Sequence, residues 1–162
     1  MVCGKGEPSN VRIALSTANQ FALMKGIIEE QEDVKEMEEI LLAQIDLATF
    51  KRCVEYAQWV KKEANEPSKI VKPIETKDIA ELVTQWEATF INSPDKDALF
   101  AVILAANNLE CQSLLELTCA KVAVMIKQKN LKECREMFSI QNDFSPQEEE
   151  QIEKENSVFE RS

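Results

Sequence analysis

Apolar residues recur at helical spacing along most of the chain. The clearest run follows Asp46, a favourable N-cap residue, and continues through Leu47, Phe50, Val54, Ala57 and Val60 at intervals of three and four. The same spacing predicts helices over 17–30, 79–90 and 111–127. Another helix should start at Ser93-Pro94-Asp95, which offers a capping hydroxyl, a proline for the first helical position and an acid for the positive first turn.

Shorter segments carry different patterns. Residues 11–15 alternate apolar and other residues like a strand, and 40–45 is short and aliphatic enough for a second strand. Residues 29–39 are almost uniformly acidic and predict an exposed connection. Residues 63–78 mix prolines and charges without a period and predict a loop.

Two helices are apolar enough to form the centre of a core. The run 98–106 is apolar on all sides, so we expect this helix to be buried on most of its surface. In 111–127, one face repeats Leu115, Cys119, Val122 and Ile126. The sequence therefore predicts the helix over 98–106 as the central core helix and 111–127 as a second apolar helix.

The C-terminal segment has strong helix starts but few apolar residues. Asn130 with Glu133 predicts a short helix ending near Phe138, and Ser145 with Glu148 predicts another start. Between 147 and 156 the only large apolar residue is Ile152, so this helix cannot bury enough surface to hold itself in place. We expect residues from about 147 onward to become helical on binding a partner. The anchors would be Phe144, Ile152, Val158 and Phe159.

Composition narrows the class of protein. The chain has 162 residues, 44% of them apolar, and a net charge of −10, which fits one globular domain. No secretory signal or spanning segment is visible, so we expect a soluble intracellular protein without a membrane partner. The acidic balance argues against nucleic acid as a partner, because that binding depends on clustered Lys and Arg.

Several kinds of chemistry are excluded. The chain has no histidine and no C-x-x-C pair among its five cysteines, which argues against a metal site and against His-assisted nucleophiles. Cys53, Cys119 and Cys134 fall in apolar helical runs and should pack as small hydrophobes. One catalytic alternative remains, a ligase with a thioester on Cys111, because that residue lies near a helix start; the competing interpretation is an ordinary, partly exposed thiol.

The chain resembles the Skp adaptor family over essentially its whole length. The resemblance is densest over the last 75 or so residues, in the segments Ile103-Leu-Ala-Ala-Asn-Asn-Leu109, Leu117-Thr-Cys119, Asn142-Asp-Phe144 and Lys154-Glu-Asn156. Weaker matches include Phe50-Lys-Arg52 and the spacing of Trp86 with Phe90. Elongin C shares the core of this family but lacks the C-terminal extension, so the segment 130–160 favours the Skp adaptors.

The resemblance implies an α/β, mainly helical fold with a POZ-like (BTB-like) core, in which a small three-stranded sheet is flanked by helices. It implies a core over 1–128 and a C-terminal F-box-binding extension over 129–162. The function implied is that of a non-enzymatic adaptor, which links F-box substrate receptors to a cullin in an SCF-type ubiquitin ligase of the cytoplasm and nucleus. No cofactor is implied.

The resemblance also implies two sets of binding residues. Those toward the cullin are Phe100, Leu104, Asn107 and Asn108. Those toward the F-box are Leu115, Val122, Ile126, Phe138, Ile140, Asn142, Phe144, Ile152, Asn156, Val158 and Phe159.

The chain departs from the family at three places. Residues 1–10 lack the family's regular first strand, Asn108 stands where a tyrosine is usual, and Val158 stands where a tryptophan is usual. These departures suggest a diverged paralogue. They leave open an F-box-binding subunit that acts without a cullin, and they leave open whether the free chain forms a weak homodimer.

Overall fold

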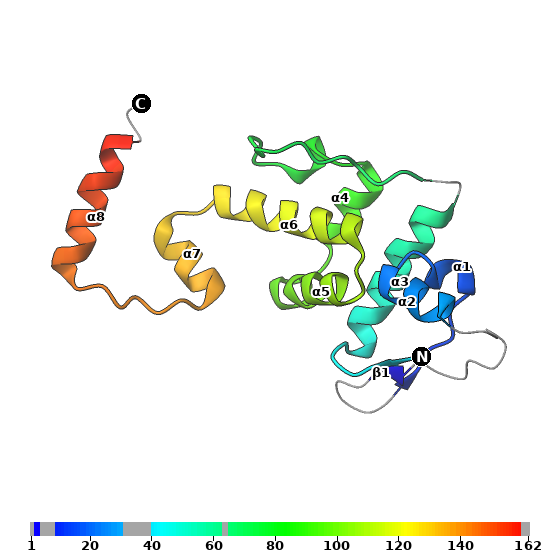
Figure 1. Cartoon of the computed structure of the whole chain (residues 1–162). Helices are drawn as coiled ribbons and strands as arrows, with labels where there is room; N and C mark the ends of the chain where they lie inside the picture. Colours follow the sequence, from blue (N-terminus) through cyan, green and yellow to red (C-terminus); the bar gives the residue numbers. More distant parts are fainter. Residues whose placement is uncertain (1, 4–8, 31–39, 63–64, 160–162) are drawn as a thin grey trace. The chain divides into compact units, whose positions relative to one another are not determined.

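The structure is a computed structural model that describes residues 2–3, 9–30, 40–62 and 65–159 (Figure 1). At residues 2, 3, 9, 10, 146, 153 and 156–159 it describes the backbone alone. The chain divides into two compact units, Met1–Met125 and Ile126–Ser162, and each is described by itself.

The described chain is mainly helical. In the first unit the helices are α1 (Leu15–Ala18), α2 (Ala22–Glu29), α3 (Leu47–Lys61), the 3-10 helix η3 (Ile79–Glu81), α4 (Gln85–Asn92), α5 (Lys96–Asn108) and α6 (Gln112–Lys127), whose last two residues belong to the second unit. The second unit contains α7 (Leu131–Phe138) and α8 (Pro146–Phe159). The mainly helical character predicted from the sequence is therefore confirmed.

Three strands of two residues each complete the first unit. They are β1 (Val2–Cys3), β2 (Ser9–Asn10) and β3 (Leu41–Leu42), in the order β2-β1-β3. β1 runs antiparallel to β2 and parallel to β3. Strands this short do not identify a POZ-like sheet, so that finer assignment is taken up below as a proposal.

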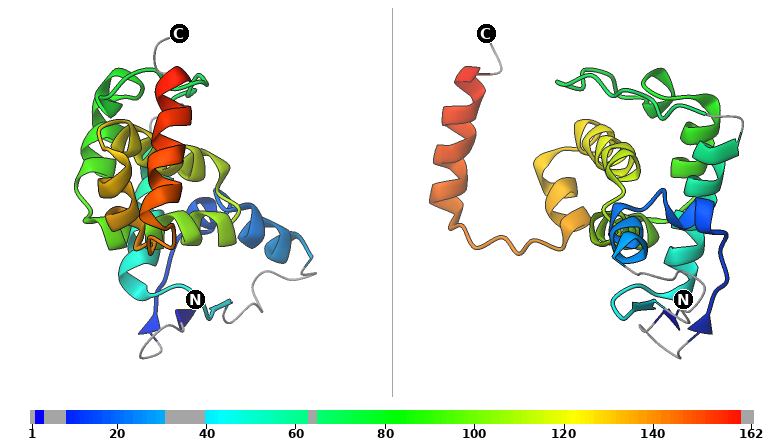
Figure 2. Two further views of the ribbon diagram at one scale, coloured as in Figure 1. Left: turned by 90° about the vertical axis from the view of Figure 1, so that its left-hand side faces the viewer. Right: turned by 45° about the vertical axis from the view of Figure 1, so that its right-hand side comes forward.

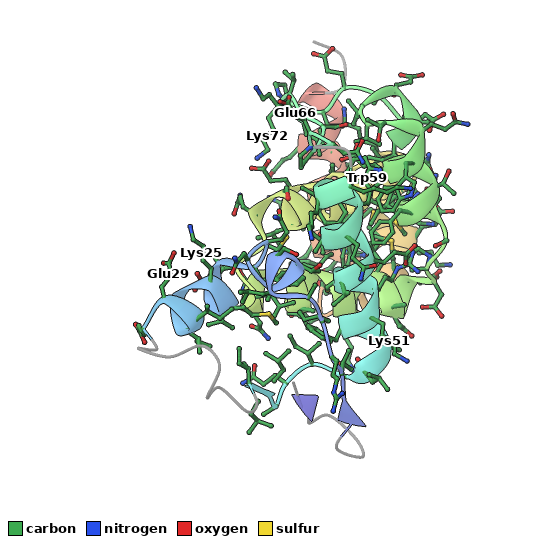
Figure 3. All side chains as sticks on the ribbon, turned by 90° about the vertical axis from the view of Figure 1, so that its right-hand side faces the viewer. Lys25, Glu29, Lys51, Trp59, Glu66 and Lys72 are labelled. Carbon is green, nitrogen blue, oxygen red and sulfur yellow. The ribbon has the colours of Figure 1, made fainter. Side chains whose placement is uncertain are left out.

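The core of the first unit forms around α3, which packs against α1 and α5. Asp46 caps α3 as predicted, since its carboxylate accepts the Thr49 N–H at 2.9 Å. Trp59, labelled on α3 in Figure 3, stacks on Trp86 with ring centroids 4.4 Å apart, and Trp86 stacks on Phe90 at 5.1 Å. Aromatic stacking thus ties α3 to α4.

A buried carboxylate holds the loop before η3. Glu87 of α4 is only 1% exposed and completes a capping box with Thr84, whose N–H donates to it at 3.0 Å. It also accepts from the Ser68 N–H at 3.1 Å and the Ser68 hydroxyl at 2.5 Å. The loop predicted over 63–78 is present in its described part, 65–78, and this carboxylate fixes one end of it.

The N-terminal predictions are wrong in part. Residues 11–14 belong to no strand, and α1 begins at Leu15; Val11 and Ile13 still pack on the core, which explains their alternation. The helix predicted over 17–30 is two helices, because Phe21 adopts extended backbone angles that bury its ring against Phe50. β3 covers only two of the residues 40–45. Of the predicted acidic connection, residues 31–39 lie outside the described part.

The helix predicted over 79–90 and the start proposed at Ser93 also need correction. η3 and α4 are separated, because Thr84 caps a new helix. α5 is capped by Asp95, which accepts the Ala98 N–H at 2.8 Å, whereas the Ser93 hydroxyl donates to the Phe90 carbonyl at 3.1 Å and is not the cap. Proline and serine therefore precede α5 instead of starting it.

The predicted caps of the second unit are both confirmed. Asn130 and Glu133 form the capping box of α7, and Ser145 exchanges hydrogen bonds with Glu148 at the start of α8. Figure 2 shows α8 as a continuous helix after an extended connector. α8 is helical as far as Phe159, and the expectation that residues from about 147 onward fold only on binding a partner stays a prediction for amide exchange.

Candidate functional site

The predicted cullin-binding residues share one side of α5. Phe100, Leu104 and Asn108 are spaced by four residues, which places them on one face, and Asn107 lies beside them. Leu104 is 65% exposed, the two asparagines are exposed and Phe100 is half-buried. The expectation that this helix is buried on most sides is met only in part: Leu99, Val102, Ala105 and Ala106 are buried and Ile103 packs against the core, but Leu104 is exposed. We call Phe100, Leu104, Asn107 and Asn108 the α5 surface.

Local structure explains why α5 ends beside its asparagines. Leu109 is fully buried, and Glu110 takes a left-handed φ of 54°, so the Cys111 N–H can donate to the Ala106 carbonyl at 2.9 Å. The Asn108 amide remains outside, where its nitrogen donates weakly to the Gln44 side-chain oxygen at 3.4 Å. The α5 surface thus combines an apolar centre with exposed amides.

The second unit exposes several large apolar side chains. The exposed side chains, which we call the C-terminal apolar surface, are Ile126 (39% exposed), Leu131 (57%), Phe138 (37%), Ile140 (58%) and Phe144 (46%). All but Leu131 were predicted from the sequence as F-box contacts. Exposed apolar groups gathered on one segment indicate a surface for a partner.

A left-handed turn after α7 leads into the connector that contains Ile140 and Phe144. Ser139 adopts φ 55° after α7, and the Ile140 N–H donates back to the Arg135 carbonyl at 2.9 Å. This turn ends the helix and leaves Ile140 outside it. The connector then runs through Asn142 and Phe144 to the start of α8, where Ile152 is half-buried.

A carboxylate joins the connector to both helices of the second unit. The Glu149 Oε1 atom accepts from Arg135 Nη1 and from Asn142 Nδ2, each at 2.7 Å. The Arg135 guanidinium also lies 5.8 Å from the centre of the Phe144 ring. The Arg135 hydrogen bond, with the Asn142 amide, lowers the pKa of Glu149, which keeps it charged at neutral pH.

Two of the predicted contacts on α6, Leu115 and Val122, belong to the first unit. Leu115 and Val122 are half-buried against the core of the first unit. Leu115 also lines a groove of about 450 Å³ between α6 and the loop around Pro73, together with exposed Cys119. The backbone at Asn156, Val158 and Phe159 is helical, but their side chains lie outside the described residues.

Cys111, the cysteine considered from the sequence as a nucleophile, is buried. Cys111 is 5% exposed and burial raises its pKa, so it is neither the partly exposed thiol nor the reactive one considered from the sequence. Cys53 is buried as predicted, Cys134 is half-buried, and Cys119 is exposed, contrary to prediction, because it faces the groove.

Neither a cluster of metal ligands nor a membrane-spanning helix is present among the described residues. No group of three or more His, Cys, Asp or Glu side chains is placed to hold a metal ion within that part of the chain. Among the helices described, none has the length and apolar content needed to cross a membrane.

Sequence reasoning missed two charged centres, Glu87 and the Arg135–Glu149 pair. The Thr84-x-x-Glu87 spacing was a usable signal for the first, since it is a capping box. The burial of Glu87 and the pairing of Glu149 with Arg135 depend on residues 14 or more positions away, which no local pattern reveals.

The sequence is similar to those of several known proteins. Residues 112–158 match the model of the Skp1 family, dimerisation domain. The S-phase kinase-associated protein 1 homolog of Tetrahymena thermophila is 37% identical over 94% of this chain and 89% of its own length. SKP1-like protein 18 of Arabidopsis thaliana is 38% identical over 81% and 79%, and the E3 ubiquitin ligase complex SCF subunit sconC of Talaromyces stipitatus is 33% identical over 91% and 88%. The chain belongs to the Skp1 family.

Proposed function

We propose that this protein is a non-catalytic adaptor of an SCF-type E3 ubiquitin ligase, which binds an F-box protein with its C-terminal apolar surface and a cullin with its α5 surface. The observation that carries the proposal is the exposure of Ile140 and Phe144, at 58% and 46%, within the segment that matches the family model. The relative from Talaromyces stipitatus is named as an SCF subunit, which supports the same role for this chain.

The proposal includes the finer assignments implied by the resemblance. Residues 1–128 form a POZ-like core, 129–162 form the F-box-binding extension, and the protein acts in the cytoplasm and nucleus. The half-buried α6 residues Leu115 and Val122 contribute to the F-box contact through the exposed part of their side chains. These assignments predict that the two partners bind at separate surfaces of the chain.

A charge introduced into the C-terminal apolar surface tests the F-box contact. Ile140→Asp should abolish binding of a purified F-box domain, since a charge buried without a partner costs several kcal/mol, on the order of a modest affinity. Val71→Asp is the matched control, because Val71 is 76% exposed and lies outside both proposed surfaces. The measurement is a calorimetric titration with circular dichroism of each variant. Equal binding by folded Ile140→Asp would remove this residue from the interface.

The α5 surface is tested with the N-terminal domain of a cullin. Leu104→Asp should abolish cullin binding and leave F-box binding unchanged. The alternative function, an F-box-binding subunit without a cullin, is motivated by Asn108, which offers less apolar area than the tyrosine usual in the family. Under the proposal Asn108→Tyr should tighten cullin binding, by roughly thirtyfold if an aromatic anchor contributes about 2 kcal/mol. A native chain that binds the F-box domain but no cullin supports the alternative.

A further inference from the structure

The connector between α7 and α8 is closed by hydrogen bonds at both ends. At its start the left-handed Ser139 lets Ile140 bond back to the Arg135 carbonyl. At its end the Phe144 N–H donates to the Asn142 side chain at 3.4 Å, and Ser145 caps α8. Residues 139–145 therefore have a defined path although they contain no regular secondary structure.

Glu149 links the two ends of this path. Its Oε1 atom accepts from Arg135, which belongs to α7, and from Asn142, which belongs to the connector. Glu149 itself lies in α8, so one oxygen atom joins three consecutive segments of the second unit. The Arg135 side chain is 19% exposed and the Glu149 side chain 37%, so this pair is less exposed than the Lys154–Glu150 pair of α8, at 73% and 67%.

The same arginine also orients a proposed partner contact. Its guanidinium lies over the Phe144 ring at 5.8 Å, a geometry in which a cation is attracted to the ring face. Phe144 keeps 46% of its surface exposed, and Ile140 keeps 58%. Neither side chain has enough burial of its own to fix its position, so their placement depends on the contacts of the connector.

We propose that Glu149 is a positioning residue: with Arg135 and Asn142 it forms a clamp that holds the connector in the conformation that receives the F-box helix. This inference rests on the proposed function and adds a residue to it that makes no contact with the partner. Loss of the clamp lowers the fraction of free chains that are ready to bind, and the apparent dissociation constant rises in proportion.

The neighbouring glutamate offers a matched control. Glu150 has the same side chain and pairs with Lys154 at 2.7 Å, but both side chains are more than two-thirds exposed and belong to α8 alone. Glu149→Ala removes the clamp, whereas Glu150→Ala makes the same change in net charge and leaves the clamp intact. Glu149→Gln keeps an oxygen for the Asn142 amide and loses the charge paired with Arg135.

The experiment measures binding of an F-box domain to the full chain by surface plasmon resonance. Glu149→Ala should weaken binding about tenfold, as expected if roughly one chain in ten remains competent, and the loss should lie in the association rate. Glu149→Gln should fall between Glu149→Ala and the native chain, and Glu150→Ala should change binding less than about twofold. A charge swap, Arg135→Glu with Glu149→Arg, restores an ion pair between α7 and α8 and should therefore recover part of the association rate lost in Glu149→Ala.

Amide exchange of the free chains gives a second readout. Amides 139–145 should lose protection in Glu149→Ala, while those of α6 stay unchanged. Equal binding by native chain and Glu149→Ala, or an equal loss in Glu150→Ala, would overturn the clamp while the proposed function stands. A native chain that binds no F-box domain would overturn the proposed function and the inference with it.

Discussion

Replacing Glu87 with alanine should destabilise the first unit more than any exposed glutamate does. Glu87 is 1% exposed and accepts hydrogen bonds from the N–H and hydroxyl groups of Ser68 and Thr84, at 2.5 to 3.1 Å. Alanine removes the Glu87 half of the capping box of α4, while the Thr84 hydroxyl can still accept from the backbone N–H of residue 87. It leaves part-buried donors without this acceptor, at about 1–3 kcal/mol in total.

Two effects reduce the stability that Glu87→Ala loses. The Thr84 N–H keeps an acceptor in the Ser68 hydroxyl at 3.1 Å, and the cost of burying a carboxylate disappears with it. The net loss should be about 1–2 kcal/mol, which for a chain of this size lowers the unfolding midpoint by roughly 2–8 °C. Glu87→Gln should lose less, because one amide oxygen still accepts from Ser68.

The assay is thermal unfolding followed by amide exchange over residues 65–78. Glu55→Ala on α3 is the control, since Glu55 is exposed. The loop amides should lose protection in Glu87→Ala and keep it in Glu55→Ala. If both alanine variants unfold at the same temperature, the buried carboxylate does not stabilise the loop and the reasoning is wrong.

The remaining predictions concern α2 and the thiols. Gly26→Ala should raise the free energy of unfolding by about 0.5–1 kcal/mol in a urea titration, because a Cβ at this helical position meets nothing within 4 Å; an unchanged midpoint contradicts this. Burial raises the pKa of Cys53 to about 12 from the ordinary thiol value of 9.0. Between these values the unfolded chain loses the thiol proton and the folded chain keeps it, so the stability that this thiol contributes is complete below pH 9.0 and is lost as the pH rises toward 12. Alkaline unfolding should therefore be steeper in the native chain than in Cys53→Ala. A maleimide at pH 8 should label exposed Cys119 before buried Cys111, as peptide mass spectrometry would show, and the reverse order would contradict the assigned burial.

Helix starts were the most predictable features, because their signals are local. The caps at Asp46, Asn130 and Ser145 each need only a side chain and a backbone N–H three residues away. The start at Ser93 was placed two residues early, since Ser93 and Asp95 are both good caps and only the path of the chain decides between them. Local chemistry therefore predicts that a helix begins, and tertiary structure selects the residue.

The N-terminal segment was harder to predict because tertiary burial overrides its period. The apolar residues over 17–30 keep helical spacing, although the helix is interrupted at Phe21. The interruption occurs because Phe21 buries its ring near Phe50 with an extended backbone. Similarly, Val11 and Ile13 pack on the core two residues apart, as alternate residues of a strand do, yet residues 11–14 belong to no strand. A period records which side chains are buried, and different backbones can bury the same set.

In the two proposed binding surfaces, the sequence contains more apolar residues than the core buries. α5 reads as apolar on every side, but the core takes Leu99 and Val102 and leaves Leu104 65% exposed. In the second unit, Ile140 and Phe144 remain exposed although that unit buries Met137. An exposed leucine or phenylalanine gains nothing for an isolated chain, so a surplus that gathers on one face is best explained by a partner. Because one surplus lies on each unit, cullin and F-box binding should respond independently to Leu104→Asp and Ile140→Asp, and a variant that loses both partners would indicate unfolding instead of a lost contact.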